Sequence, residues 1–199
     1  SIYGAIENMY TTNMTDMNSL FQYLNEFNAD LSKWDVSNVT TMEFMFNYAQ
    51  SFNGSIANWD TSKVENMNYM FNGASAFNQN VNHLDKSSIK PGAYTNFMFQ
   101  NARAFNNGDD AGESKKPLKF TNDNGYGNAW GMFRWCVSFN QDVNGLNASG
   151  LNDFDSMFLG ATAFNQNVTP LFTQARPNAI SQYFGGVFLG CTAFNNGGE

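Results

Sequence analysis

The stretch MFNYAQSFNGSIANWDTSKVENMNYMFNGASAFNQN, residues 45–80, contains the same short pattern twice. Met-Phe, five residues and Phe-Asn occupy residues 45–53 and recur 25 residues later, at 70–78. Most residues between the fixed positions change from one copy to the next. A pattern kept at an interval of this length is typical of a repeat protein, in which each copy forms one structural unit.

The two phenylalanines of this pattern recur along the whole chain and always stand six residues apart. The distance from one copy to the next varies instead, as 25, 25, 28, 34, 25 and 30 residues. All of this variation falls in the arc between Phe-Asn and the next Met-Phe, so insertions are confined to one part of the unit. The pairs are Phe21 and Phe27, Phe46 and Phe52, Phe71 and Phe77, Phe99 and Phe105, Phe133 and Phe139, Phe158 and Phe164, and Phe188 and Phe194.

Two hydrophobic periodicities alternate within each copy. Residues 39–49 carry apolar side chains at helical spacing, and Ser37 stands where an N-cap would. Residues 28–34 carry one aliphatic side chain between polar residues, as a short strand does. Three aspartates share the slot before the expected helix, where we expect them to cap its N-terminus: Asp35, Asp60 and Asp85.

These patterns predict an α/β repeat solenoid, a right-handed, leucine-rich-repeat-like coil of short strand plus short helix with about seven coils. One unit cannot bury its apolar stripe alone, whereas stacked neighbours can. We expect a single solenoid over residues 1–199, with insertions at 107–130 and 169–183 that protrude from one side as a contact surface. The coils are expected to end near residues 28, 53, 78, 106, 140, 165 and 195.

Four further slots of the repeat hold apolar residues and are predicted to form the core. They lie four, seven, twelve and fifteen residues after the phenylalanine of Phe-Asn. Their occupants are Leu31, Ile56, Val81, Val143 and Val168; Trp34, Trp59, Leu84, Leu146 and Leu171; Val39, Val64 and Leu151; and Met42, Met67 and Phe154.

The two cysteines, Cys136 and Cys191, occupy a slot that holds alanine in four other coils. They lie two coils apart, with Ala161 between them. At about 4.8 Å per coil their Cα atoms would be roughly 9–10 Å apart, whereas a disulfide needs about 4.4–6.8 Å. We therefore predict two free, buried, unreactive thiols.

The Phe-Asn asparagine occupies one slot beside a predicted core aromatic. A buried amide there must be hydrogen-bonded or cost about 1–3 kcal/mol. It can satisfy backbone groups at a turn or pair with the same amide one coil along. We predict a structural asparagine ladder made of Asn28, Asn53, Asn78, Asn106, Asn140, Asn165 and Asn195.

Composition excludes several classes of function. A net charge of −7 and a pI of about 4.5 argue against a nucleic-acid partner, because few cations are present to neutralise phosphates. No apolar run approaches the roughly 20 residues of a membrane helix, so the chain is not predicted to span a membrane. The lone histidine, His83, has no partner at a recognisable catalytic or metal-binding spacing. We predict no enzymatic activity and no cofactor.

The longest insertion is also the most charged stretch of the chain. Asp109, Asp110 and Glu113 form a weak calcium candidate within it, because carboxylate oxygens suit that ion. The full spacing of a calcium loop is missing, and a surface loop is the simpler interpretation. Basic residues gather in the two insertions of an otherwise acidic chain: Lys115, Lys116, Lys119 and Arg176.

The segment FNADLSKWDVSNVTTMEFMFNYAQSFN, residues 27–53, resembles the repeat of the BspA-like leucine-rich-repeat surface proteins. That repeat has the same Phe-Asn, Trp-Asp, Ser-x-Val, Met-x-x-Met-Phe and Ala positions at a 25-residue period. The likeness weakens between residues 107 and 130, and Trp-Asp is lost after the third coil. The resemblance implies an extracytoplasmic binding or adhesion role and no known enzymatic activity.

We therefore expect a surface adhesion or recognition module, cell-surface or secreted, that binds a protein or a glycan. The alternative is a structural subunit docked on a larger extracytoplasmic or organellar complex, such as one of an algal membrane. Besides the basic residues, the expected contacts lie on the predicted strand face: Asp30, Ser32, Ser55, Ala57, Asn80, Asn82, Asp142, Asn144, Asn167 and Thr169.

Overall fold

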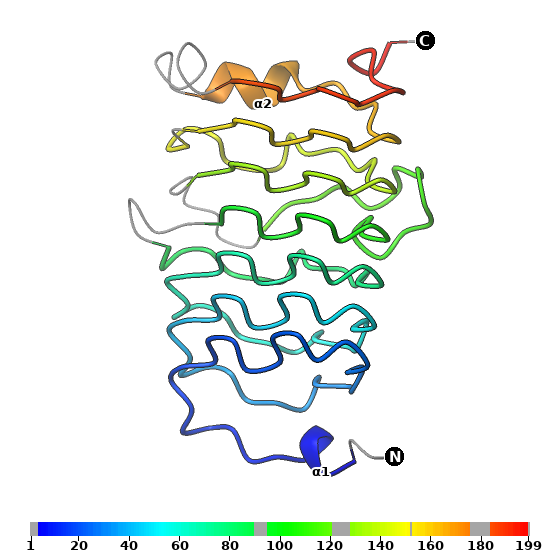
Figure 1. Cartoon of the computed structure of the whole chain (residues 1–199). Helices are drawn as coiled ribbons and strands as arrows, with labels where there is room; N and C mark the ends of the chain where they lie inside the picture. Colours follow the sequence, from blue (N-terminus) through cyan, green and yellow to red (C-terminus); the bar gives the residue numbers. More distant parts are fainter. Residues whose placement is uncertain (1–3, 90–94, 121–127, 152, 176–183, 199) are drawn as a thin grey trace.

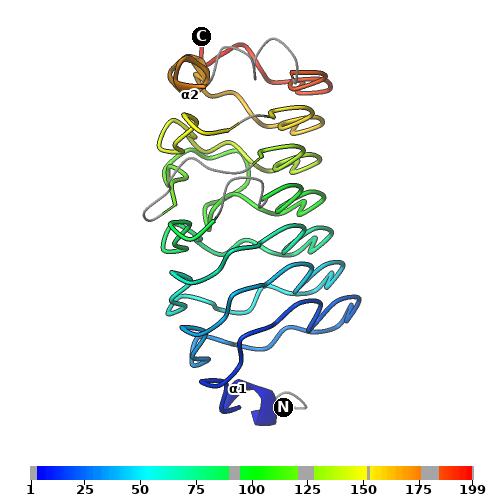
Figure 2. The same ribbon diagram turned by 90° about the vertical axis from the view of Figure 1, so that its left-hand side faces the viewer.

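The computed structural model describes residues 4–89, 95–120, 128–151, 153–175 and 184–198. The chain winds into a stack of coils, with the N-terminus at the lower end and the C-terminus at the upper end of Figure 1. In each coil a wavy run crosses the front of Figure 1, and these runs lie above one another along the right-hand edge of Figure 2. One cluster of buried side chains extends through the stack from Met17 to Cys191.

Regular secondary structure is scarce, and the predicted α/β solenoid is wrong. The described residues contain two short helices, α1 (Gly4–Glu7) and α2 (Thr169–Gln174), and neither lies in the segment where helices were expected. Those residues form no strand either, and their β-type pairs are isolated bridges, such as the parallel ones that join Asp16, Thr41 and Asn66. The stack is therefore not a leucine-rich-repeat-like alternation of strand and helix.

A ribbon of overlapping turns replaces the predicted helix, as residues 42–49 illustrate. Every second N–H donates to the carbonyl three residues earlier: Met45 to Met42, Asn47 to Phe44, and Ala49 to Phe46, at 3.0–3.2 Å. The N–H groups in between donate to the next coil: Phe44 to Asn68, Phe46 to Met70, and Tyr48 to Asn72, at 2.7–2.9 Å. We call this segment of each coil the turn ribbon. Its backbone groups alternate between local and inter-coil partners, so both sets are satisfied.

The same hydrogen bonds join every pair of successive coils, whatever the length of the arc between them. The N–H of the Met-Phe phenylalanine donates each time to a carbonyl of the following ribbon, at 2.9–3.0 Å. Insertions therefore leave the alignment of the ribbons unchanged. The bonds run from Phe21 to Met45, Phe46 to Met70, Phe71 to Met98, Phe99 to Met132, Phe133 to Met157, and Phe158 to Val187.

Two residues in each ribbon have left-handed backbone conformations, two positions before and two after the Met-Phe phenylalanine. In the coil of Phe46 they are Phe44 (φ 56°) and Tyr48 (φ 58°). This conformation costs a bulky residue roughly 1–2 kcal/mol, which the inter-coil hydrogen bonds must offset. The pairs are Ser19 and Tyr23, Phe44 and Tyr48, Tyr69 and Gly73, Phe97 and Asn101, Gly131 and Trp135, Ser156 and Gly160, and Gly186 and Gly190.

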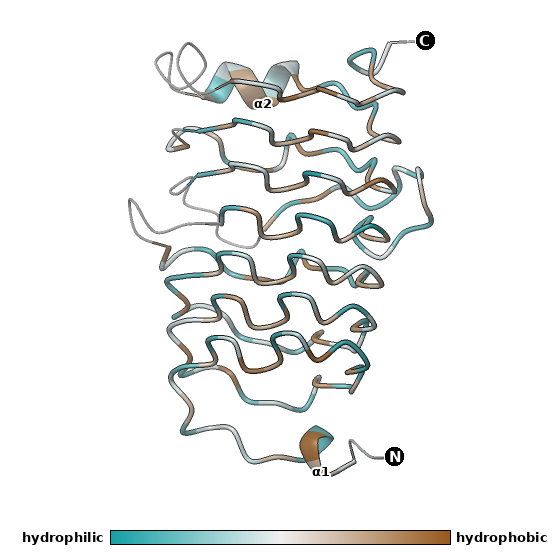
Figure 3. Ribbon diagram, in the orientation of Figure 1, coloured by the Kyte–Doolittle hydropathy of each residue, from teal (hydrophilic) through white to brown (hydrophobic). Residues whose placement is uncertain are grey.

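The helical spacing of apolar residues is compatible with this ribbon, which explains why the helix prediction failed. Met42, Met45, Phe46 and Ala49 are all fully buried, as a helical stripe would be. The ribbon also closes local bonds three residues apart, so it returns side chains to one face at the same intervals. Figure 3 shows hydrophobic and hydrophilic stretches alternating along the runs.

The phenylalanines form two columns of stacked rings through the stack. Within one coil the rings of Phe46 and Phe52 lie 3.9 Å apart, with an interplanar angle of 6°. Between coils, the centroids of Phe46 and Phe71 lie 5.4 Å apart. Those of Phe52 and Phe77 lie 5.9 Å apart. Each inner ring therefore touches rings on both faces, and this contact explains the constant six-residue interval.

The predicted core positions are confirmed. Every residue assigned to the four apolar slots is buried, from Leu31 at the N-terminal end to Leu171. Cys136 and Cys191 are buried and free, as the slot assignment predicted. Burial raises the pKa of the Cys191 thiol to about 11, and it also raises the pKa of Cys136. Neither thiol is a ready nucleophile near neutral pH.

The aspartates predicted as helix caps instead close small turns of their own. Oδ1 of Asp35 accepts the N–H of Ser37 at 3.1 Å and its hydroxyl at 2.6 Å. Because of these two hydrogen bonds, hydroxyl and then backbone, the pKa of Asp35 lies below its ordinary value. In the same way, Oδ1 of Asp60 accepts the N–H of Ser62, and Oδ1 of Asp85 accepts the N–H of Ser87.

Truncation of one ring in the middle of a column should destabilise the protein strongly. Phe77→Ala removes a fully buried ring with neighbours on both faces, so we expect a loss of about 3–5 kcal/mol in the free energy of unfolding. Phe194→Ala is the matched control, because its half-buried ring has one column neighbour, Phe164. Urea unfolding followed by tryptophan fluorescence measures both. Equal losses would contradict the stacking argument.

Candidate recognition surface

The asparagine ladder is made of bonds from one side chain to the next backbone. Oδ1 of Asn28 accepts the N–H of Asn53 at 2.8 Å, and Oδ1 of Asn53 accepts the N–H of Asn78 at 2.9 Å. The bond recurs at 2.8 Å at each later step, to Asn106, Asn140, Asn165 and Asn195. The expectation that these amides are buried is wrong for most of them: only Asn106 is buried, and Asn28, Asn53 and Asn195 are exposed.

The first part of the long insertion folds back onto this ladder. Nδ2 of Asn78 donates to the carbonyl of Asp109 at 2.8 Å, and Nδ2 of Asn140 donates to the carbonyl of Gly112 at 2.7 Å. Nδ2 of Asn106 donates to the carbonyls of Asp110 and Glu113. We call residues 107–117 the ladder loop. It is held mainly by its backbone carbonyls; among its charged side chains, Asp109 accepts a hydrogen bond from Nε2 of Gln141 at 3.4 Å.

The ladder loop does not assemble the weak calcium candidate. Oδ2 of Asp109 accepts the backbone N–H of Lys115 at 2.9 Å, and Glu113 pairs with Lys115 Nζ at 2.9 Å. Desolvation acts to raise the pKa of Asp109, but hydrogen bonds from the N–H groups of Lys115 and Asp110 bring it below its ordinary value. Within the described part of the chain, no three acidic, histidine or cysteine side chains group as metal ligands would.

The residues expected to line a strand face are engaged mainly in turns and inter-coil contacts. Oδ1 of Asp30 accepts the N–H of Ser32, and Oγ of Ser55 accepts that of Ala57. The asparagine side chains of Asn82 and Asn144 bond to the Pro117 and Asn167 carbonyls. A side-chain Oδ1 also accepts the N–H of the residue two positions later in three other places: Asn80 from Asn82, Asp142 from Asn144, and Asn167 from Thr169. No strand presents these residues as one row.

The described parts of the two insertions lie at different places on the stack. The ladder loop covers the Phe-Asn corner, at the right of Figure 1, whereas residues 169–174 form α2 at the top of the stack. Lys115, Lys116 and Lys119 are exposed, and Lys116 Nζ bonds to the Gly108 carbonyl. Arg176 and the segments 121–127 and 176–183 lie outside the described residues.

Aromatic side chains gather on the outer face of the turn ribbons, which the sequence analysis missed. All of them except Trp130, which precedes the left-handed Gly131, occupy the two left-handed slots, two residues from the buried phenylalanines. Along one slot the rings of Phe44 and Tyr69 stack at 4.9 Å, as do those of Tyr69 and Phe97. Along the other, Tyr23 and Tyr48 stack at 5.7 Å. We call this the aromatic face.

Each run of stacked rings ends at a glycine, which holds the same left-handed slot in the following coil. A Cβ on Gly73 would lie 2.8 Å from the Tyr48 ring, and one on Gly160 would lie 2.2 Å from the Trp135 ring. Phe97 covers Gly131 in the same way, and Trp130 then lies 4.7 Å from the Phe97 ring. The rings of Tyr48 and Trp135 therefore lie against the backbone of the following coil and remain partly exposed, whereas Phe97 is buried.

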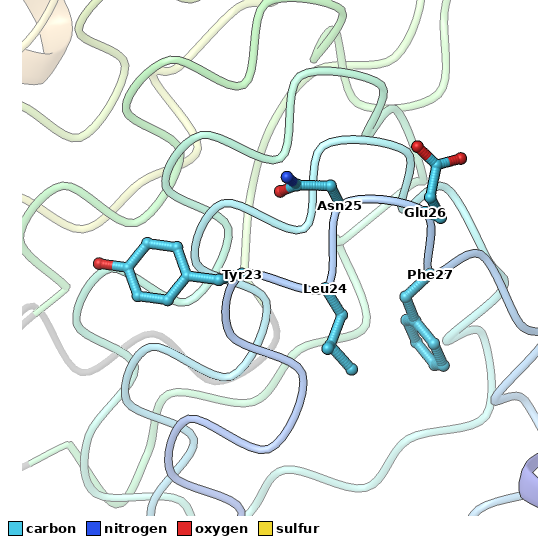
Figure 4. Close-up of a pocket in the computed structure, with 5 residues that line it drawn as sticks. All are labelled: Tyr23, Leu24, Asn25, Glu26 and Phe27. Carbon is cyan, nitrogen blue, oxygen red and sulfur yellow. The ribbon is translucent and has the colours of Figure 1, made fainter.

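The aromatic face leaves large apolar surfaces open to water. The exposed fractions are 63% for Tyr23, 38% for Tyr48, 40% for Trp130 and 42% for Trp135. One signal in the sequence could have located this face. Aromatic residues recur two positions before or after the Met-Phe phenylalanine, and in a turn ribbon these positions can face solvent. A separate pocket of about 330 Å³ lies at the first corner, lined by Tyr23, Leu24, Asn25, Glu26 and Phe27 (Figure 4).

The lone histidine is placed as a structural group. Nε2 of His83 lies 2.9 Å from the carbonyl of Ile56 in the preceding coil. Burial lowers the pKa of His83, although the hydrogen bond to Ile56 acts in the opposite direction. Its ring is therefore neutral at physiological pH and bonded to the backbone.

A stack of coils that repeats one backbone pattern places this chain among the repeat proteins. It belongs to the family described as "Mycoplasma protein of unknown function, DUF285", whose model matches residues 1–111 and 121–197. Comparisons with curated proteins and with solved structures found no match. In the described part of the chain, no helix has the length and apolarity needed to cross a membrane.

Removal of one ladder amide should destabilise the stack. Oδ1 of Asn78 accepts the N–H groups of Asn106 and Gly108, at 2.8 and 2.9 Å. Asn78→Leu leaves those groups and the Asp109 carbonyl without this partner, at a cost of about 1–3 kcal/mol. The side chain of Asn195 makes no hydrogen bond among the described residues, so Asn195→Leu should be nearly neutral. Thermal melts of both variants test this, and an unchanged melting temperature for Asn78→Leu would refute it.

Deletion of residues 109–116 should also destabilise the protein, contrary to the expectation for a free surface loop. The deletion removes the carbonyl acceptors of Asn78, Asn106 and Asn140, and we expect a loss of at least about 1 kcal/mol. Lys115→Ala is the control, because it removes only an exposed ion pair, which contributes little to stability. Denaturant midpoints measure both changes, and a deletion variant as stable as Lys115→Ala would show that the loop is not anchored.

Proposed function

We propose that this chain is a non-enzymatic recognition module that binds a protein or a glycan at a cell surface. The observation that carries the proposal is the aromatic face, with Tyr48, Trp130 and Trp135 each about two-fifths exposed. Tyrosine and tryptophan are the residues most enriched at binding hot spots, because a ring buries much area and keeps a polar handle. Contiguous exposed apolar surface on a soluble fold marks an interaction site.

The architecture supports binding by a preformed surface. The rings are held by stacking on neighbours and on glycine backbone, so little conformational freedom remains to be lost when a partner docks. Charged residues make up only 14% of the chain. A partner can therefore be recognised by apolar contact and neutral hydrogen bonds, without charge pairing.

The resemblance to the BspA-like surface proteins supports the adhesive role and the extracytoplasmic location. It rests on the Phe-Asn, Trp-Asp and Met-x-x-Met-Phe positions of residues 27–53. The family matched over most of the chain carries no function in its description, so adhesion is our own proposal. A structural subunit of a larger complex is the second candidate, and the exposed Lys115, Lys116 and Lys119 of an acidic chain favour it as a docking point.

The four tryptophans allow a direct test of the aromatic face. Trp34 and Trp59 are each 3% exposed, whereas Trp130 and Trp135 are exposed to about 40%. Screening the chain against an array of defined glycans and a panel of purified surface proteins should yield a binder that protects Trp130 and Trp135 from acrylamide quenching. Trp135→Ala should weaken binding about tenfold, as loss of a hot-spot contact worth about 1.4 kcal/mol would.

Tyr10→Ala is the matched control, because Tyr10 is an 80% exposed aromatic residue outside the turn ribbons. Its affinity should equal that of the unchanged chain. Binding that leaves tryptophan quenching untouched, or that falls equally in both variants, would reject the aromatic face. Isolation in fixed proportion with one large complex, through the lysines of the ladder loop, would favour the structural alternative.

A further inference from the structure

Within the described residues, three enclosed polar side-chain atoms have no hydrogen-bond partner, and all three belong to the turn ribbons of successive coils. They are Oδ1 of Asn72, Oδ1 of Asn96 and Nε of Arg134. Asn72 and Arg134 each follow the Met-Phe phenylalanine directly, and Asn96 stands three residues before it. Buried polar groups in folded proteins are nearly always paired, so this cluster needs an explanation that the fold itself does not supply.

The slot that follows the Met-Phe phenylalanine is paired in the coils before this cluster. Nδ2 of Asn72 donates to Oδ1 of Asn47 at 2.7 Å. Gln100 and Arg134 hold this slot in the next two coils, and their side chains bond to no described residue. The column of paired amides therefore ends at Asn72 and leaves polar groups unused in the two coils that follow.

Two exposed tryptophans belong to the same part of the stack. Trp130 and Trp135 are 40% and 42% exposed, and their indole N–H groups donate to no described residue. The buried tryptophans differ, because the indole N–H groups of Trp34 and Trp59 donate to backbone carbonyls of the preceding coil at 2.8 and 2.9 Å. The exposed indoles therefore keep a donor for a ligand.

The ring of Trp135 stacks on no aromatic ring of the described residues. On one side it lies against Gly160, where a Cβ would come within 2.2 Å of the ring. On the other side the same slot of the preceding coil holds Asn101, whose N–H donates to the Arg134 carbonyl at 2.8 Å. An amide therefore borders the second face of this indole, where the tyrosines of the slot have one another.

Two of the three arginines of this acidic chain lie at the same place. Arg134 directly precedes Trp135, and the carbonyl of Arg103 accepts the N–H of Ser138 at 3.2 Å. Arg103 is exposed, Arg134 is half-buried, and neither pairs with a described carboxylate. A guanidinium group presents parallel N–H donors that match the two oxygens of a carboxylate. Charge pairing is not required over the aromatic face as a whole, but here the chain offers it.

We call Gln100, Asn101, Arg103, Trp130, Arg134 and Trp135 the tryptophan patch. We propose that this patch binds a sugar residue that carries a carboxylate. The C–H face of the sugar ring stacks on Trp135, and the guanidinium of Arg134 holds the carboxylate. Hydroxyl groups both donate and accept, so the side-chain amides of Gln100 and Asn101 can serve them in either direction. This inference rests on the proposed function, because it names the class of glycan that the aromatic face binds.

The size and chemistry of the tryptophan patch favour a glycan over a protein as the source of the carboxylate. The patch is confined to two adjacent coils, about 5 Å apart, whereas a protein partner typically covers about 20–30 residues on each side. Its polar groups other than the arginines are neutral amides and indole N–H groups, which suit the many hydroxyls of a sugar. An aspartate or glutamate side chain has no hydroxyls and would leave these groups unpaired.

Tryptophan fluorescence titrations of the unchanged chain with paired sugars test the inference. Trigalacturonate carries carboxylates along a chain, sialyllactose carries one on a terminal residue, and the methyl ester of each keeps the sugar while it removes the charge. We expect at least one acid to bind about tenfold more tightly than its own ester. The pair that shows this preference identifies the source of the carboxylate. Equal affinities for acid and ester in both pairs, or no binding of either acid, would overturn the inference.

Variants assign the preference to the tryptophan patch. Arg134→Gln should reduce the affinity ratio of acid to ester to about one, whereas Trp135→Ala should weaken the binding of acid and ester alike. Lys33→Gln is the matched control, because it removes the same charge from an exposed site outside the turn ribbons and should keep the preference. Equal ratios in Arg134→Gln and Lys33→Gln would contradict the role given to Arg134.

The same titrations separate this inference from the proposed function. A surface protein or a neutral glycan that protects Trp135 from quenching, while neither acid is preferred over its ester, would overturn the inference and leave the proposed function intact. A chain whose exposed tryptophans are protected by no glycan and no surface protein would reject both.

Discussion

The alternation of backbone hydrogen bonds along the turn ribbon is the constraint on which the rest of the structure depends. One N–H in two closes a local turn, and the other reaches the next coil. The ribbon cannot satisfy its own backbone alone, since half of its donors point along the stack. Neighbouring coils are therefore required for each coil to exist, and cooperativity is built into the backbone before any side chain is considered.

The side chains follow from this alternation. Buried phenylalanines stack at the ribbon centre and at the corner, which fixes the six-residue interval between them. Left-handed residues two positions on either side turn outward, so the same ribbon that forms the core also builds the aromatic face. Packing and recognition are thus opposite sides of one element, and a change of the ribbon register would affect both.

The sequence predicts the repeat, the buried core slots and the two free, buried cysteines, because these depend only on which residues face the core. Val39, Met42 and Phe46 are buried whether residues 39–49 form a helix or a turn ribbon. The choice between the two depends on inter-coil bonds such as that from Phe46 to Met70, which no local pattern encodes. The candidate site was missed for the same reason, since Phe44 and Tyr48 face solvent only in the left-handed conformation. The prediction for the ladder loop was wrong because its backbone carbonyls, which no sequence pattern marks, make most of the contacts.

The inter-coil bonds of the ribbons also share one direction. Each runs from an N–H to a carbonyl of the following coil, from Phe21 at one end to Phe158 near the other. Peptide groups aligned in this way add their dipoles, as they do along a helix axis. The column of ribbons is therefore electrically polar, with partial positive charge at the coil of Phe188 and partial negative charge at the coil of Phe21. Unlike a helix, this column lengthens by whole coils. The size of its dipole therefore depends on the number of repeats and not on any one segment.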